Sequence, residues 1–196
     1  EDTPTDKIGR SNTKQLDKYL NKLIKYLPKE TPIIILSQVK PGFTRKYFKK
    51  RKEVYYQVET LIFGNAIERA KNPDRIIIGI NDKTKTKINN NYINFLKLFK
   101  SDILKMNFES AELSKISINA FLISSLTTTN MLSKISEKIN ADWNDIIPAL
   151  TKDKRIGKYA YIKSGLGIAG GNLERDLFTI SKIINSDKVY LNLINS

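Results

Sequence analysis

The sequence predicts a fold in two parts, an α/β part over residues 1–107 and an all-α part over residues 108–196. In the first part, short apolar runs alternate with stretches of helical spacing, an order that argues for a parallel α/β sheet. From Ser110 onward, the apolar residues recur with the 3.6-residue period of helices. We therefore expect no strand beyond residue 115.

The first part opens with a loop and an amphipathic helix. Ser11 or Asn12 can cap this helix, and Pro28 ends it. Its apolar face comprises Leu16, Tyr19, Leu20, Leu23, Ile24 and Leu27. Strands are expected at 33–36, 54–58, 75–80 and 103–106, and further helices at 43–52, from about residue 60 and at 88–100.

The second part is expected to be built on one long helix from Ser110 to about Asn140. Its apolar stripe comprises Leu113, Ile116, Ala120, Ile123, Leu132, Ile135 and Ile139. A second helix runs from Ala141 to Leu150, with Trp143 and Ile146 as expected core residues. A helix with such wide apolar coverage needs a partner surface.

A glycine-rich stretch follows, from Gly165 to Gly171, with four glycines in seven positions. Glycine serves where the backbone takes an unusual φ or approaches a ligand closely. The residues from Asn172 to Asn185 have helical spacing, so the glycines lead into a helix N-terminus, where free N–H groups favour anions. A flexible interdomain loop is the alternative interpretation.

Composition excludes several kinds of chemistry. The chain contains no cysteine and no histidine, which excludes disulfides, thiolate nucleophiles, Cys/His zinc sites and histidine acid–base catalysis. No apolar run approaches the length of a membrane span, and the first residues carry no basic or apolar signal region. We expect no membrane contact, no metal site and a cytoplasmic location.

The net charge of +14 raises the question of nucleic acid. The densest basic run is 45–52, in which aromatic residues are interleaved. A solvated helix face is the commoner meaning of such a run, and a phosphate-bearing nucleotide sugar would also favour a basic surface. We therefore do not expect nucleic acid as the partner, and keep a basic nucleic-acid-binding module as a third hypothesis.

Three stretches together resemble a known family. They are Ser110–Leu122, which opens the long helix, the segment Asp153–Gly157, and the stretch Gly165–Asp176, in which Asp176 follows Asn172 by four residues. Their order and spacing resemble those of the nucleotide-sugar 6-dehydrogenases, which act on UDP-glucose, GDP-mannose or UDP-N-acetylmannosamine in polysaccharide biosynthesis. The resemblance covers nearly the whole chain and implies the second part of a Rossmann-like NAD-binding domain followed by the family's central, dimer-forming helical domain.

The resemblance implies roles for residues on the long helix and at the end of the chain. Lys115 and Asn119, four apart on one helix face, would stabilise the oxygen that gains negative charge at the reacting sugar carbon. Asp176 would support the water or thiol chemistry. Arg175 would face the cofactor, and Arg155 would reach the nucleotide sugar of the partner subunit. Without the family context, these residues read as solvated polar or surface side chains.

Further roles fall in the first part. Glu59 matches the family's general base acting through water, whereas the motif's second glutamate falls on Phe63. Thr3 and Ser37 would contact the cofactor, although the threonine expected after Ser37 is Gln38 here. Leu61 and Ala169 would contact the substrate. The simpler interpretations are a strand-end carboxylate for Glu59 and a plain Pro-Gly turn after Ser37.

Asn172 stands where the family has its nucleophilic cysteine. An amide cannot form a thiohemiacetal, so an intact relative with this residue would perform only the reversible alcohol–aldehyde step with NAD. No G-x-G-x-x-G follows a first strand, so we expect the chain to be a middle portion of the family's sequence. An inactive remnant that serves as a structural or dimerisation module is the alternative. The sequence names neither the sugar nor the choice between NAD and NADP.

Overall fold

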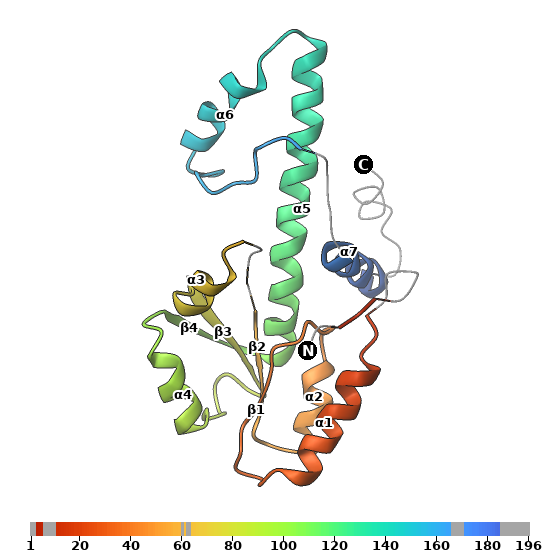
Figure 1. Cartoon of the computed structure of the whole chain (residues 1–196), viewed down its shortest axis with the longest axis vertical. Coiled ribbons are helices and arrows are strands. Elements are labelled where there is room, and N and C mark those ends of the chain that lie inside the picture. The colour runs from red at the N-terminus through yellow and green to blue at the C-terminus, as the bar shows by residue number, and fades with distance from the viewer. Residues whose placement is uncertain (1–2, 6–10, 60, 62–63, 166–170, 185–196) are drawn as a thin grey trace. The chain divides into compact units, whose positions relative to one another are not determined.

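The computed structural model describes residues 3–5, 11–59, 61, 64–165 and 171–184 (Figure 1). The chain forms two compact units, Glu1–Lys115 and Ile116–Ser196, which we call the sheet unit and the helical unit. The elements are α1 (Lys14–Tyr26), β1 (Ile33–Ile35), α2 (Phe43–Phe48), β2 (Val54–Gln57), α3 (Ala66–Lys71), β3 (Arg75–Ile80), α4 (Asn90–Lys97), β4 (Asp102–Asn107), α5 (Phe108–Lys138), α6 (Trp143–Lys152) and α7 (Gly171–Ile184). Every described strand precedes Phe108, which confirms the predicted change of fold class.

The four strands lie in the order β1-β2-β3-β4 in one mixed sheet. β1 and β2 are parallel, as are β3 and β4, but β2 and β3 are antiparallel. The prediction of a parallel sheet was therefore wrong at this pair. A parallel pair of strands needs a crossover connection, usually a helix packed on the sheet. Between β3 and β4, α4 buries Tyr92 and Leu96, whereas α3, between β2 and β3, buries no residue.

The sheet is covered on both faces, because alternate residues of its strands enter two separate cores. One core joins Tyr56 of β2 and Ile77 of β3 to residues of α1, α2 and the start of α5. The other joins Tyr55 and Ile78 to residues of α4. Figure 1 shows these helices on opposite sides of the sheet. The sheet unit is thus a three-layer α/β/α structure.

Two predicted helices have different bounds in the structure. α2 ends at Phe48 rather than at residue 52, because the chain turns and the Arg51 side chain folds inward onto backbone carbonyl oxygens. α3 begins at Ala66 rather than near residue 60, because Gly64 has a φ of 81° and breaks the helical backbone just before it. The N-cap residue of α1 is Thr13 rather than the predicted Ser11 or Asn12, and its side chain makes no capping hydrogen bond, although the Asn12 side chain accepts the Lys14 N–H.

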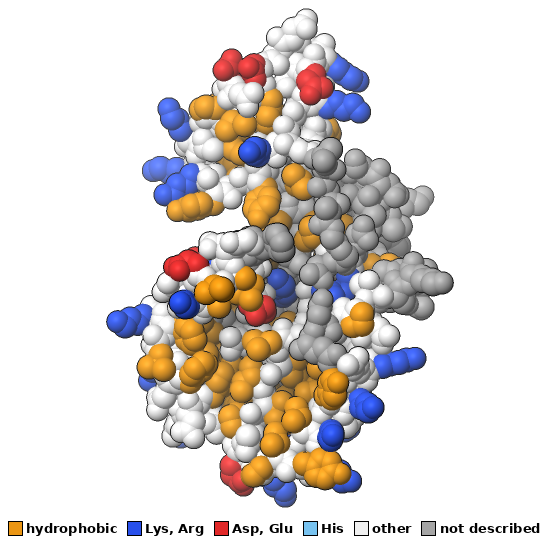
Figure 2. All heavy atoms as spheres, in the orientation of Figure 1, with side chains coloured by type: hydrophobic (Ala, Val, Ile, Leu, Met, Phe, Trp, Pro, Cys, Tyr) orange, Lys and Arg blue, Asp and Glu red, His pale blue; other side chains and the backbone are white. Residues whose placement is uncertain are grey.

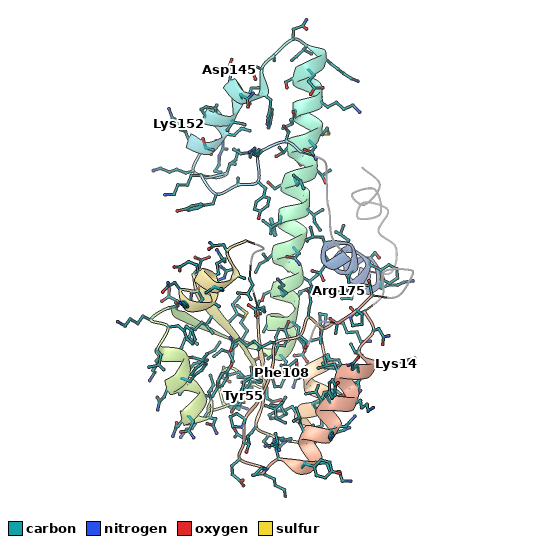
Figure 3. All side chains as sticks on the ribbon, in the orientation of Figure 1. Lys14, Tyr55, Phe108, Asp145, Lys152 and Arg175 are labelled. Carbon is teal, nitrogen blue, oxygen red and sulfur yellow. The ribbon has the colours of Figure 1, made fainter. Side chains whose placement is uncertain are left out.

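The first turns of α5 lie close against the sheet at Gly79. A Cβ added to Gly79 would lie 3.0 Å from the Ala111 Cβ, 3.1 Å from the Tyr56 Cβ and 3.3 Å from the Phe108 Cα. Only glycine lets helix and strand approach this closely. Phe108 itself is fully buried and contacts Phe48, with ring centroids 5.6 Å apart (Figure 3).

The helical unit contains the rest of α5 together with α6 and α7. Ile116 and Ile123 of α5, Trp143 of α6 and Leu177 of α7 are buried. Asp142 caps α6 by accepting the Asn144 N–H. None of the described helices is long and apolar enough to cross a membrane.

Candidate functional site

A buried polar pair joins α5 and α7 within the helical unit. The Asn119 Nδ2 donates a hydrogen bond of 2.5 Å to the Asp176 Oδ2, and the two residues are 7% and 2% exposed. A carboxylate only accepts hydrogen bonds, so it fixes which end of the Asn119 amide carries nitrogen. The amide nitrogen has two N–H groups, so the pair can present a second, oriented donor to a ligand. Sequence reasoning chose both residues but did not predict that they bond to each other.

Arg175 precedes Asp176 in α7 and is also buried, with 2% of its surface exposed. A guanidinium always carries charge at physiological pH, and burying it is costly unless it is paired. Arg175 makes at least one hydrogen-bonding, ring or electrostatic interaction in the structure. Arg175 is therefore a buried cation of α7 (Figure 3), and its role as a cofactor-facing side chain stays a prediction.

Side chains of α5 and α6 anchor the segment that leads to the glycine stretch. Thr129 Oγ1 donates to the Tyr161 carbonyl oxygen at 2.7 Å, and Trp143 Nε1 donates to that of Ile162 at 3.1 Å. The Asn130 side-chain oxygen accepts the Gly165 N–H at 3.0 Å. Sequence reasoning missed Thr129 and Asn130. The one sequence feature that could have indicated Thr129 and Asn130 is that polar residues there interrupt the apolar stripe of the long helix.

In the sheet unit, two predicted cofactor-binding residues lie on neighbouring segments. Thr3 is buried, and its Oγ1 donates a 2.6 Å hydrogen bond to the carbonyl oxygen of Gln38, the residue after Ser37. Ser37 is also buried and follows the carboxyl end of β1. Because β1 and β2 are parallel neighbours, Glu59, which follows β2, lies at the same sheet edge. Ligands of α/β proteins bind at this edge.

A buried carboxylate ties α5 to the start of α2. Glu112 Oε2 accepts the Gly42 N–H at 2.6 Å, and Oε1 accepts the Thr44 N–H at 2.8 Å. Burial raises the pKa of Glu112, and the two N–H groups oppose that rise because they favour the charged form. One turn earlier, Glu109 pairs with Arg45, whose Nη2 lies 2.7 Å from Oε2, and this pair lowers the pKa of Glu109.

The other predicted site residues are more exposed, have only local contacts or lie outside the described part of the chain. Glu59 is exposed, Leu61 is 43% exposed, and Lys115 is partly buried. Arg155 is bound to Asp153 in a local turn, with its side chain 89% exposed. Ala169 lies outside the described residues, as does the side chain of Asn172. Within the described part of the chain, no group of His, Cys, Asp and Glu could hold a metal ion.

The dense basic run 45–52 contributes to the core rather than to an open aromatic surface. Tyr47 is fully buried, and its hydroxyl donates to Asp17. Arg51 is 6% exposed and donates to the carbonyl oxygens of Leu27, Pro28 and Thr31. On the face seen in Figure 2, lysine and arginine side chains are scattered, alone or in small groups, among other side chains. Aromatic rings inside the core are not available to stack on bases.

Residues 109–196 match the central domain of the UDP-glucose/GDP-mannose dehydrogenase family. The chain is 26% identical to a UDP-glucose 6-dehydrogenase of Rickettsia prowazekii over 200 residues, which covers 99% of the chain and 46% of that protein. It thus spans about half the length of the curated relatives it matches.

Solved structures show the same fold. A UDP-glucose dehydrogenase from Pyrobaculum islandicum superposes with a TM-score of 0.79 at 23% identity, covering 98% of this chain and 46% of that one. A UDP-D-ManNAc dehydrogenase from Pyrococcus horikoshii gives a TM-score of 0.78 at 17% identity, covering 98% and 48%. At these identities the likeness establishes the fold, a Rossmann-like part followed by the central helical domain.

Proposed function

Because the chain belongs to the UDP-glucose/GDP-mannose dehydrogenase family, we propose that it forms part of an NAD-dependent enzyme that oxidises the C6 alcohol of a nucleotide sugar. The observation that carries this proposal is the buried Asn119–Asp176 pair. Both residues match catalytic positions of the family, and their bond gives Asn119 a fixed donor direction. A solvated polar residue would need no such partner.

The chain's own residues supply binding and charge stabilisation in this proposal. Lys115 and the second N–H of Asn119 donate hydrogen bonds to the C6 oxygen as it gains negative charge. Glu59 holds the water that takes the hydroxyl proton. Arg155 reaches the nucleotide sugar, with Leu61 and Ala169 as further substrate contacts. NAD, when bound, accepts the hydride from C6.

We place the dinucleotide at the sheet edge after β1. Thr3 and Ser37 are buried there, and the Thr3 hydroxyl joins its own segment to the backbone at Gln38. A dinucleotide at the carboxyl edge of an α/β sheet lies against such segments. We assign Thr3 and Ser37 to this contact. We keep Arg175, the cation that precedes Asp176 in α7, as a cofactor contact.

Asn172 limits the reaction to its first step. Oxidation to the acid by the covalent route needs a thiolate that attacks the aldehyde, and the chain has no cysteine anywhere. The expected product is therefore the aldehyde or its hydrate. The absence of the nucleophile from the sequence also favours a second candidate, an inactive structural module that keeps the family's dimer-forming helices.

The experiment is to express the full product of the gene and count NADH formed per nucleotide sugar with an aldehyde trap present. One NADH per sugar, with trapped aldehyde, is expected. Asn172→Cys should move the count toward two and yield free uronic acid, whereas the control Asn91→Cys, at an exposed position of α4, should leave the count at one. Two NADH per sugar from the unchanged protein would refute the one-step reaction. No NAD reduction by either protein would favour the structural module.

A further inference from the structure

Among the described residues of the sheet unit, Glu112 is the least exposed carboxylate, with 0% of its surface exposed. Each of its oxygens accepts one backbone N–H from the turn that opens α2, at Gly42 and at Thr44. Two acceptors facing two donors make a bidentate contact, which fixes the orientation of the carboxylate as well as its distance. The contact therefore holds α5 against the turn, although Glu112 lies 70 positions after Gly42 and 68 positions after Thr44 in the sequence.

The backbone of the turn is shaped to receive this carboxylate. Gly42 has a φ of 90°, a left-handed conformation that a residue with a side chain rarely adopts. This conformation lets the N–H groups of Gly42 and Thr44 converge on one point at the start of α2. An unpaired N–H at a buried helix start would be destabilising, so the turn depends on its distant partner.

The two ends of this contact belong to the two sides of the proposed reaction site. The turn follows Ser37, which we assign to the cofactor, by only five residues. On α5, Glu112 precedes Lys115, which we assign to the substrate oxygen, by three residues, or about one helical turn. The close approach of α5 at Gly79 makes this part of the helix rigid against the sheet. A shift of one side relative to the other would therefore disturb the Glu112 contact, which joins the two directly.

We propose that Glu112 is a positioning residue, which holds Lys115 in register with the cofactor-side turn at Ser37–Gly42. The inference rests on the proposed function. Hydride transfer requires donor carbon and acceptor ring in near contact, so a small misplacement slows the chemical step more than it weakens binding. Glu112 touches neither reactant, and its effect is transmitted through the backbone of the turn and the helix.

The test compares Glu112→Gln with Glu109→Gln in the full product of the gene. Gln keeps the shape of Glu112 but has one acceptor oxygen, so one of the two N–H groups loses its partner. We expect kcat to fall on the order of 10- to 100-fold with little change in the KM for the nucleotide sugar, and a larger isotope effect from sugar deuterated at C6. Glu109→Gln removes a carboxylate of the same helix one turn earlier, and should leave kcat, KM and the isotope effect unchanged.

An activity-independent measurement tests the contact itself. Amide hydrogen exchange at Gly42 and Thr44 should accelerate in Glu112→Gln and not in Glu109→Gln. Unchanged exchange in Glu112→Gln would overturn the contact. Faster exchange with kcat lowered only in proportion to the folded fraction would make Glu112 structural and overturn the positioning role. If the unchanged protein reduces no NAD, the proposed function fails and the positioning role with it, while the exchange data still decide whether the contact exists.

Discussion

Phe108 and Phe121 lie on the same helix, α5, yet their surroundings are opposite. Phe108, in the sheet unit, is 0% exposed and packs in the core with Phe48. Phe121, in the helical unit, is 80% exposed. One helix thus carries the same residue type as a core anchor in its first turn and as a surface side chain three to four turns later.

The difference shows that the two units bury their apolar side chains in different ways. The sheet unit encloses two apolar clusters with its own helices and strands. In the helical unit, α5 exposes several apolar side chains, namely Phe121 at 80%, Met131 at 55% and Ile135 at 44%, and Ile139, just after its end, is 68% exposed. Large apolar side chains gathered on one helix mark an interaction surface. We propose that this surface is the dimer contact implied by the family resemblance.

The largest effect is expected from Phe108→Ala. Removing a fully buried phenylalanine leaves a cavity between α5, α2 and the sheet, and costs about 3–5 kcal/mol of folding free energy. Urea denaturation followed by circular dichroism measures the loss. A change below about 1 kcal/mol would mean that the sheet unit does not depend on this core, and the comparison with Phe121 would fail.

Phe121→Ser is expected to affect association rather than folding. The side chain is exposed within its own chain, so the free energy of unfolding should change by less than about 0.5 kcal/mol. If a second copy covers it, the dimer should weaken at least about tenfold, since burying one phenylalanine is worth roughly 1.5–3 kcal/mol.

Sedimentation of the full product of the gene at micromolar concentration measures this effect. The matched control is Leu98→Ser, because Leu98 is 74% exposed at the end of α4 in the sheet unit. The control should sediment like the unchanged protein. A dimer that survives Phe121→Ser unaltered, or an unchanged protein that is only monomeric, would contradict the proposed surface.

Much of the fold was predictable because periodicity reports apolar positions directly. The bounds of β3 were predicted residue for residue, and the long helix to within two residues at each end. The direction of β2 relative to β3 was not predictable, because it depends on whether α3 packs over the sheet, and a six-residue helix carries too little pattern to decide. Periodicity also placed Leu23, Ile135 and Ile116 alike on the apolar faces of predicted helices. In the structure, Leu23 and Ile135 are 40% and 44% exposed, whereas Ile116 is 1% exposed.

The candidate site was predictable as a set of residues but not as a set of contacts. Asn119 and Asp176 were chosen from the family resemblance, and their hydrogen bond spans 57 positions that no local pattern connects. The contact of Glu112 was not predicted from the sequence, because its partners are backbone N–H groups. Nearly every residue type has such a group, so residue identity does not reveal the contact. Buried contacts of this kind emerge only from the fold.

The smallest expected effect concerns the Arg45–Glu109 pair of the sheet unit. Arg45 lowers the pKa of Glu109 below its ordinary value of 4.5. A carboxylate with a lowered folded-state pKa stabilises the fold above its unfolded-state pKa, and this stability is lost as pH falls through the folded-state value. The side chains are 35% and 42% exposed, so solvent screens the pair and its contribution is about 0.2–1 kcal/mol.

Glu109→Gln should therefore lower the thermal midpoint by at most about 4 °C at pH 7 and by less at pH 3. Glu137→Gln, an exposed position on the same helix in the helical unit, is the control and should show no difference at either pH. A deficit in Glu109→Gln that stays equal at both pH values would mean that the ion pair is not its source.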